Sequence, residues 1–267
     1  MDLRGLMKLS LLDYPGQVAC TVFTGGCNLR CPFCHNPSLV LPERLRAEPP
    51  TVTVEAFFSF LDKRRGVLDG VCITGGEPLM QPDLPAFIRE IRARGYLVKL
   101  DTNGTFPERL EPLLAEGLVD FVAMDVKNSL ARYPQTVGIP GFSTDAVARS
   151  IRLLLEERVP YEFRTTVIRE LHRQEDLLAL AGLIKGARAY ALQQFVDSGD
   201  LVSGDLVSGD PGSSTPGSND PGSGNPGSAG MDASGATPVL TGYAPEEMEA
   251  LAQAVRTLVP ATVVRGV

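Results

Sequence analysis

Three closely spaced cysteines are the residues of this 267-residue chain best suited to carry chemistry. Cys27, Cys31 and Cys34 form a C-x3-C-x2-C cluster that follows the pair Gly25-Gly26. This spacing lets three thiolates face one centre from a short loop. A [4Fe–4S] cluster bound by three cysteines keeps one iron open, and an open position at a metal indicates catalysis, as it does at zinc sites. The cysteines therefore predict a catalytic [4Fe–4S] cluster.

Two other interpretations of the same residues stay open at this point. The sequence Cys31-Pro32-Phe33-Cys34-His35 matches the C-x-x-C-H motif of c-type haem attachment, although that motif gives Cys27 no role. A zinc site made of the three cysteines and His35 is the other candidate, although His35 directly follows Cys34 and would strain a tetrahedral site. The remaining cysteines, Cys20 and Cys72, lie in apolar runs and are expected in the core.

Apolar, β-branched runs alternate along the chain with helix-periodic segments, and these elements must position the cysteines. The runs that predict strands are 18–23, 71–73, 97–100, 119–126, 161–168 and 190–195. The segments that predict helices are 54–65, 84–94, 107–116, 145–158, 175–185 and 245–258. Strands alternating with helices predict a parallel α/β sheet with right-handed crossovers, either doubly wound or a partial barrel.

Polar or glycine-rich residues follow every predicted strand at its carboxyl end. After the cysteine loop they are Thr74-Gly75-Gly76-Glu77-Pro78, Asp101-Thr102-Asn103-Gly104, Asp125-Val126-Lys127, Arg164-Thr165-Thr166 and Gln193-Gln194. In parallel α/β folds the active site lies at the carboxyl ends of the strands, so these segments are expected to meet at one mouth. This placement favours a partial, TIM-like (β/α)6 barrel with a single active site.

Charge and hydropathy narrow the class of protein. The 25 Lys and Arg against 32 Asp and Glu give a net charge of −7, which argues against a nucleic-acid-binding surface. No stretch approaches the roughly 18 consecutive apolar residues of a membrane span, and the first residues lack the features of a signal peptide. We therefore expect a cytoplasmic protein with reduced cysteines and with neither nucleic-acid nor membrane partners.

Residues 197–237 differ in composition from the rest of the chain. Of these 41 residues, 23 are Gly, Ser or Pro, six are Asp, and none is Lys, Arg or Glu. Such a segment has little apolar surface to offset the entropy cost of ordering its backbone. We expect 197–237 to be a disordered acidic insertion that is dispensable for catalysis. It would separate a barrel of residues 1–196 from a C-terminal helix and tail, 238–267, that complete the same domain.

Taken together, these motifs resemble those of one enzyme superfamily. The cysteine loop, with Phe33 before its last cysteine, and the segment Gly75-Gly76-Glu77-Pro78 are similar to motifs of the radical S-adenosylmethionine (SAM) superfamily. More narrowly, the chain resembles glycyl-radical-enzyme activases, most of all the activating proteins of anaerobic ribonucleoside-triphosphate reductase. The segments that carry this likeness are Asp13-Tyr14-Pro15-Gly16, Cys34-His35-Asn36, Asp101-Thr102-Asn103-Gly104 and Asp125-Val126-Lys127. The likeness covers the chain outside residues 197–237.

The resemblance implies a definite chemistry. Cys27, Cys31 and Cys34 would each bind one iron, and the fourth iron would hold the amino and carboxylate groups of SAM. An electron from a flavodoxin or ferredoxin-type reductant would cleave SAM to a 5′-deoxyadenosyl radical, which abstracts a hydrogen atom from a glycine Cα of the partner. That partner would be a glycyl radical enzyme, the anaerobic ribonucleoside-triphosphate reductase. The cofactors carry this chemistry, while the protein orients them and excludes quenchers.

The resemblance also assigns SAM contacts to matching positions. Phe33 is expected beside the adenine, and Gly75-Gly76 would let the backbone accept the ammonium group of SAM. Two aspartates, Asp101 and Asp125, would lie under the methionyl carboxylate, with Lys127, a monovalent cation or both balancing their charge. The full set of expected SAM contacts is Phe33, His35, Asn36, Gly75, Gly76, Glu77, Asp101, Thr102, Asn103, Asp125, Lys127 and Arg164.

The remaining Cys, Gln and His residues carry three further expectations. With only Cys20 and Cys72 outside the loop, no second cluster is expected, and Gln193-Gln194 replace a histidine that some relatives carry. His172 lies in a polar run and is expected at the surface.

The alternative functions are an activase of the pyruvate formate-lyase type, a small-molecule enzyme similar to 7-carboxy-7-deazaguanine synthase, and an iron–sulfur electron carrier. The carrier is disfavoured because carriers cap all four irons.

Overall fold

The strands of the sheet follow one another in space in the order in which they follow one another along the chain. The computed structural model of the protein describes residues 1–203 and 239–266. Its eight strands are β1 (Leu3–Ser10), β2 (Ala19–Thr24), β3 (Gly70–Gly75), β4 (Leu97–Thr102), β5 (Phe121–Asp125), β6 (Tyr161–Val167), β7 (Tyr190–Gln194) and β8 (Thr262–Arg265). All six strands expected from the sequence are present as β2–β7 and are parallel. The predicted α/β fold with a parallel, barrel-like sheet is confirmed.

The described sheet has two strands beyond the expected six, one at each edge. β1 pairs antiparallel with β2, and its middle residues are half-buried or exposed, so it lacks the apolar run of a buried strand. β8 pairs parallel with β7 but has only four residues, of which only Thr262 is fully buried. Edge strands of this kind give a weak hydrophobic pattern, which explains why both escaped the sequence analysis.

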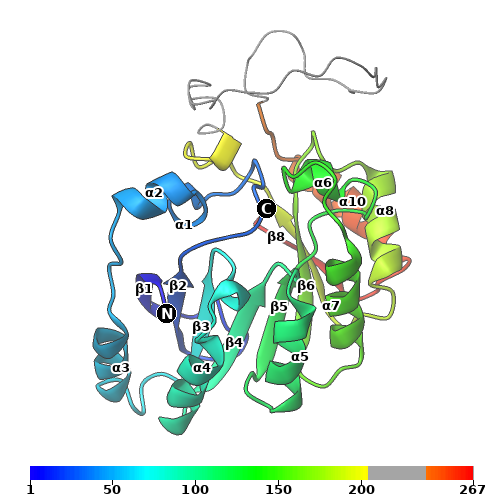
Figure 1. The fold of residues 1–267 in the computed structure, drawn as a ribbon. Helices are drawn as coiled ribbons and strands as arrows, with labels where there is room; N and C mark the ends of the chain where they lie inside the picture. Colours follow the sequence, from blue (N-terminus) through cyan, green and yellow to red (C-terminus); the bar gives the residue numbers. More distant parts are fainter. Residues whose placement is uncertain (204–238, 267) are drawn as a thin grey trace, which may run out of the picture.

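The structure includes the helices α1 (Pro37–Val40), α2 (Pro42–Ala47), α3 (Val54–Asp62), η1 (Pro78–Met80), α4 (Leu84–Ala93), α5 (Pro107–Ala115), α6 (Tyr133–Thr136), α7 (Asp145–Leu155), α8 (Gln174–Leu183) and α10 (Pro245–Arg256). Most of them lie against the outer side of the curved sheet, whereas α1, α2 and α6 lie beyond the ends of its strands (Figure 1). Several of the longer helices, α4 and α7 among them, are amphipathic. In α4, for example, Leu84, Phe87, Ile88 and Ile91 lie on one face at helical spacing and are all buried. None of the described helices is both long and apolar enough to cross a membrane.

The structure differs from the sequence expectation at the start of the acidic segment. Residues 204–237 of the expected insertion lie outside the described residues, but 197–203 are described and lie next to α1 and α2 (yellow in Figure 1). Val202 and Ser203 are buried there, and Leu201 is half-buried. The reason is the apolar pair Leu201-Val202, which gives this stretch apolar side chains that can be removed from water.

Candidate active site

A cavity of about 220 Å³ lies at the carboxyl ends of β2–β6. It is lined by every predicted site residue except Glu77, namely Cys27, Cys31, Phe33, Cys34, His35, Asn36, Gly75, Gly76, Asp101, Thr102, Asn103, Asp125, Lys127 and Arg164. Segments far apart in the sequence thus meet at one site, as parallel strands require. The cavity wall also includes Leu29, Val40, Thr74 and Thr166, which the site prediction did not include. Thr74 and Thr166 belong to the strand-end segments that were expected at the mouth, although neither was named as a site residue.

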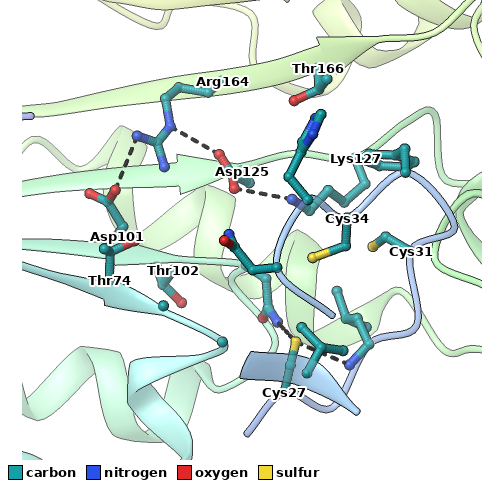
Figure 2. A pocket seen from close by; sticks show the side chains of 18 residues that line it. Cys27, Cys31, Cys34, Thr74, Asp101, Thr102, Asp125, Lys127, Arg164 and Thr166 are labelled. Carbon is teal, nitrogen blue, oxygen red and sulfur yellow. Dashed lines mark hydrogen bonds and ion pairs between the residues drawn. The ribbon is translucent and has the colours of Figure 1, made fainter. Parts of the chain in front are cut away.

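The cysteine loop places its three sulfur atoms at one side of the cavity (Figure 2). Burial raises the pKa of Cys27 to about 11 and of Cys31 to about 12, and it raises the pKa of Cys34 as well. Such thiols stay protonated unless a metal binds them, since a coordinated thiol is deprotonated outright. One buried thiol, Cys31, and two half-buried thiols, Cys27 and Cys34, line the same cavity, and three such thiols are the donor set of an iron–sulfur cluster.

The geometry around His35 argues against the zinc interpretation. In the described part of the chain, no three Cys, His, Asp or Glu side chains surround a point where they could share one metal ion. The His35 Nδ1 instead contacts the Ser198 hydroxyl at 3.1 Å, and the ring packs on Phe195. In an iron–sulfur cluster each thiolate binds its own iron, so the cysteines need not converge on a single ion. The residues present therefore fit a cluster better than a mononuclear site.

The backbone of the glycine-rich segment lies directly against the cysteine loop. The Glu77 N–H donates to the Gly26 carbonyl oxygen at 2.8 Å, and the Gly26 N–H donates to Leu39 at 2.8 Å. A Cβ on Gly76 would lie 2.0 Å from the same Gly26 oxygen. Gly26 itself has a φ of +89°, which favours glycine. These two glycines allow the two loops to touch.

Glu77 does not line the cavity, contrary to its predicted place among the SAM contacts. Its carboxylate is fully buried and accepts hydrogen bonds from Leu79 N at 3.0 Å, Thr102 Oγ1 at 2.8 Å and Asn103 N at 2.7 Å. Burial raises its pKa to about 7, against the opposing effect of these three donors. The turn after β3 directs the side chain under η1, so Glu77 positions the residues that follow β4.

A row of alternating charges, which we call the charge cluster, forms another side of the cavity. It consists of Lys99, Asp101, Arg164, Asp125 and Lys127. The Arg164 guanidinium donates to Asp125 at 2.9 Å and to Asp101 at 3.2 Å, while Lys127 Nζ lies 3.0 Å from Asp125 (Figure 2). Burial alone would raise the pKa of Asp125, but Arg164 and Lys127 outweigh it and hold that pKa well below its ordinary value.

The charge cluster supplies the positive charge that the sequence analysis assigned to Lys127 or a monovalent cation. Arg164 spans both aspartates, and the buried Lys99 ion-pairs with Asp101. Two carboxylates therefore face three cationic groups, so charge balance requires no monovalent cation. Lys99 was missed as a site residue. A lone Lys inside an apolar strand, two residues before Asp101 and hence on the same face, was the available signal.

His172 is fully buried, so its expected surface position is wrong. Its Nδ1 accepts a hydrogen bond from Ile168 N at 3.1 Å, which leaves the proton on Nε2, 2.7 Å from the Lys127 carbonyl oxygen. Burial lowers its pKa and favours this neutral form. The turn after β6 folds back beneath Lys127, which a polar sequence run does not reveal. The nearby Gln194 also points away from the cavity and donates to the Tyr243 carbonyl oxygen.

Comparison with known proteins places the chain among radical SAM enzymes. The Radical SAM superfamily profile matches residues 21–181. A protein of Methanocaldococcus jannaschii, provisionally named a glycyl-radical enzyme activating enzyme, is 36% identical over 195 residues, 72% of this chain and 78% of its own. The 7-carboxy-7-deazaguanine synthase of Methanopyrus kandleri is 35% identical over 43% of this chain, and the pyruvate formate-lyase-activating enzyme of Clostridium pasteurianum is 31% identical over 47%. The chain spans about half the length of these last two relatives.

A solved structure shows the same fold at low sequence identity. The crystal structure of Streptococcus suis SuiB matches 91% of this chain and 47% of its own with a TM-score of 0.60, at 12% identity. This likeness concerns the fold alone. The family profile covers more than half of the chain, and the relative from M. jannaschii matches most of both sequences. The chain therefore belongs to the radical SAM superfamily.

Proposed function

We propose that this protein is an activating enzyme that takes a hydrogen atom from a glycine Cα of a glycyl radical enzyme. The observation that carries the proposal is the 36% identity to the relative of M. jannaschii, over 72% of this chain and 78% of that protein. Within this class we favour anaerobic ribonucleoside-triphosphate reductase as the partner. The support for that choice is the motif resemblance of Asp101-Thr102-Asn103-Gly104 and Asp125-Val126-Lys127.

In this proposal Cys27, Cys31 and Cys34 hold a [4Fe–4S] cluster, and SAM occupies the cavity beside it. When bound, the cluster and SAM would supply the one-electron chemistry that the side chains cannot. Arg164, fixed between Asp101 and Asp125, presents a rigid positive group for a carboxylate, which suits the planar donor set of Arg. The arrangement is preorganised, so binding does not require these charges to move.

The apolar part of the cavity wall has a separate role. Phe33, Leu29 and Val40 line the cavity on the side of the cysteine loop, and all three are buried. The Phe33 ring offers a face for an adenine ring. Lys127 Nζ lies 6.0 Å from the centroid of the Phe33 ring. Apolar walls exclude water from the site, which protects a reactive radical from side reactions. These residues thus bind and shield, while the charge cluster orients.

Two further candidates are kept because relatives with those names match the chain. An activase of the pyruvate formate-lyase type is supported by the relative from C. pasteurianum. A small-molecule enzyme similar to 7-carboxy-7-deazaguanine synthase is supported by the relative from M. kandleri. An activase must admit a glycine loop of another protein into the mouth of the barrel, whereas a small-molecule enzyme closes over its substrate. Experiments with each kind of substrate can therefore distinguish the activases from the small-molecule enzyme.

The deciding experiment is anaerobic incubation of the reconstituted protein with SAM, a flavodoxin or ferredoxin-type reductant, and a candidate partner. We expect a glycine-centred electron paramagnetic resonance signal on anaerobic ribonucleoside-triphosphate reductase. A signal on a pyruvate formate-lyase type enzyme alone would instead support the second activase. SAM cleavage without a radical on either partner, together with turnover of a small-molecule substrate, would overturn the activase proposal.

A further inference from the structure

Residues 198–203, which we call the strap, run from the end of β7 back over the cysteine loop. They belong to the stretch that the sequence analysis assigned to the acidic insertion. In the structure they lie next to α1 and α2 at the cavity end of the sheet (Figure 1). The strap is separated from Cys34 by more than 160 residues of chain, so its contact with the loop is a tertiary one.

The centre of the strap is Val202, whose side chain is fully buried. It forms a small apolar cluster with Val40 and Leu41, and Cys27 and Cys34 pack against that cluster. Val40 also lines the cavity. Val202 therefore lies behind the layer of side chains that backs two of the three expected iron ligands.

Two backbone hydrogen bonds fix the strap to the cysteine loop itself. The Val202 N–H donates to the Cys34 carbonyl oxygen at 3.2 Å, and the Ser203 N–H donates to the Pro32 carbonyl oxygen at 3.1 Å. These bonds flank Phe33, which lines the cavity. The strap thus fixes the backbone on both sides of a residue that faces the ligand.

Side-chain contacts add less. Asp200 accepts two hydrogen bonds from Arg44 at 3.0 Å each, and Ser198 contacts His35 at 3.1 Å. The Asp200 side chain is 61% exposed, and exposed ion pairs contribute little to stability. Burial of the Val202 side chain is therefore the main contribution to the free energy that keeps the strap packed on the cysteine loop.

We infer that Val202 is a positioning residue for the cluster, because it holds the strap over the cysteine loop and so limits solvent access to the bound iron and sulfide. This inference rests on the proposed cluster site but not on the identity of the protein partner. Local opening of the strap would expose the loop. Replacing Val202 by a smaller side chain shifts that opening equilibrium without removing an iron ligand or a cavity residue.

The first test uses the metal-free protein and the rate at which iodoacetamide alkylates each cysteine. In Val202→Ala we expect alkylation of Cys27 and Cys34 to become about tenfold faster, as loss of buried methyl groups raises the open population. Cys72, buried in the barrel, is the internal control and should not change. Val239→Ala is the matched control, since Val239 follows the acidic segment in the sequence and is 77% exposed. Equal rates in wild type and Val202→Ala would overturn the inference.

The second test uses the anaerobically reconstituted protein and measures iron release to an iron chelator from the decay of the cluster absorbance. Release should be about tenfold faster in Val202→Ala than in wild type or Val239→Ala, whereas Val202→Ile should release iron at the wild-type rate. Unchanged release in Val202→Ala would refute the role of the strap. Absence of a cluster in wild type would refute the proposed function instead. If Val202→Ala does not fold, Val202→Thr, which keeps the side-chain shape, provides the same comparison.

Discussion

The Glu77 N–H donates a hydrogen bond to the Gly26 carbonyl oxygen at 2.8 Å, and this bond joins the glycine-rich segment after β3 to the cysteine loop after β2. The glycine between them, Gly76, has no room for a side chain at this junction. The two motifs are therefore one structural unit, although about 50 residues of chain separate them. A substitution in either motif should therefore affect both cluster binding and SAM binding.

Gly76→Ala tests this junction. A Cβ there would lie 2.0 Å from the Gly26 oxygen, so the variant must displace the cysteine loop. We expect iron content after reconstitution to fall severalfold, together with a loss of about 1–3 kcal/mol in the free energy of unfolding. Gly182→Ala in α8, where a Cβ meets nothing within 4 Å, is the matched control and should be neutral or slightly stabilising. A Gly76→Ala protein with full iron content would show that the junction tolerates separation.

The iron ligands are tested by replacing each cysteine. Reconstituted wild type should hold about four irons and four sulfides per chain, as one [4Fe–4S] cluster requires. Cys27→Ala, Cys31→Ala and Cys34→Ala should each abolish the cluster, as measured by iron and sulfide analysis and by the visible absorbance. Cys20→Ala should retain it, because Cys20 is a buried core residue of β2. Zinc in place of iron after anaerobic reconstitution would contradict the assignment.

Glu77 predicts a pH dependence of stability. Its pKa is raised to about 7 by burial, so the folded protein binds this proton more tightly than the unfolded chain does. Its contribution is therefore fully present below the ordinary Glu pKa and is lost as the pH rises through about 7. Between pH 5 and 8.5, wild type should lose on the order of 2 kcal/mol relative to Glu77→Gln, which does not titrate. Urea unfolding of both proteins at the two pH values gives the difference, and parallel curves would argue against a raised pKa.

Arg164→Ala removes the group that bridges Asp101 and Asp125. Because both carboxylates are partly buried and lose a shared partner, the free energy of unfolding should fall by about 2 kcal/mol. Arg149→Ala, which breaks the exposed pair with Glu111, should cost less than about 1 kcal/mol. Isothermal titration of the reconstituted variants with SAM should show weaker binding only for Arg164→Ala. Equal SAM affinity would remove Arg164 from the binding site.

How much of this could be predicted from the sequence depends on the type of signal. The cysteine loop and the polar ends of the strands were informative because a parallel sheet brings all its carboxyl ends to one edge. Glu77 and His172 were misplaced because their side-chain directions depend on turns, and sequence fixes that a turn exists but not where a side chain within it points. Lys99 was overlooked although the sequence held a signal: a lone Lys in an apolar strand, two residues before Asp101, lies on the same face of β4 as that aspartate.

The strap shows a different limit of composition-based reasoning. A window that averages over residues 197–237 is dominated by Gly, Ser and Asp and hides the pair Leu201-Val202 at its start. Burial of Val202 depends on a surface formed by Val40 of α1, Leu41 and the cysteine loop, far away in sequence. Only tertiary structure reveals that two apolar residues in a polar segment have a place to pack.

Two deletions locate the functional edge of the acidic segment. Replacing 204–237 by a short Gly-Ser linker should preserve iron content and reductant-driven release of 5′-deoxyadenosine, since loop length changes closure entropy only slowly. Replacing 197–237 also removes the strap and should speed iron release as Val202→Ala does. Loss of SAM cleavage in the shorter deletion would show that 204–237 belong to the catalytic domain. If both deletion variants release iron at the same rate, residues 197–203 are dispensable as well, and the functional edge of the acidic segment lies at residue 197.

The agreement between strand order and chain order has a consequence for how the protein folds during synthesis. Each strand can add to a free edge as it leaves the ribosome, and no strand has to insert between two that are already paired. The five strands whose carboxyl ends form the cavity, β2–β6, can thus pair before the acidic segment is made. Among the described strands, only β7 and β8 pair across that segment. Growth or shrinkage of the acidic segment during evolution would delay one late step and leave assembly of the catalytic mouth unaffected.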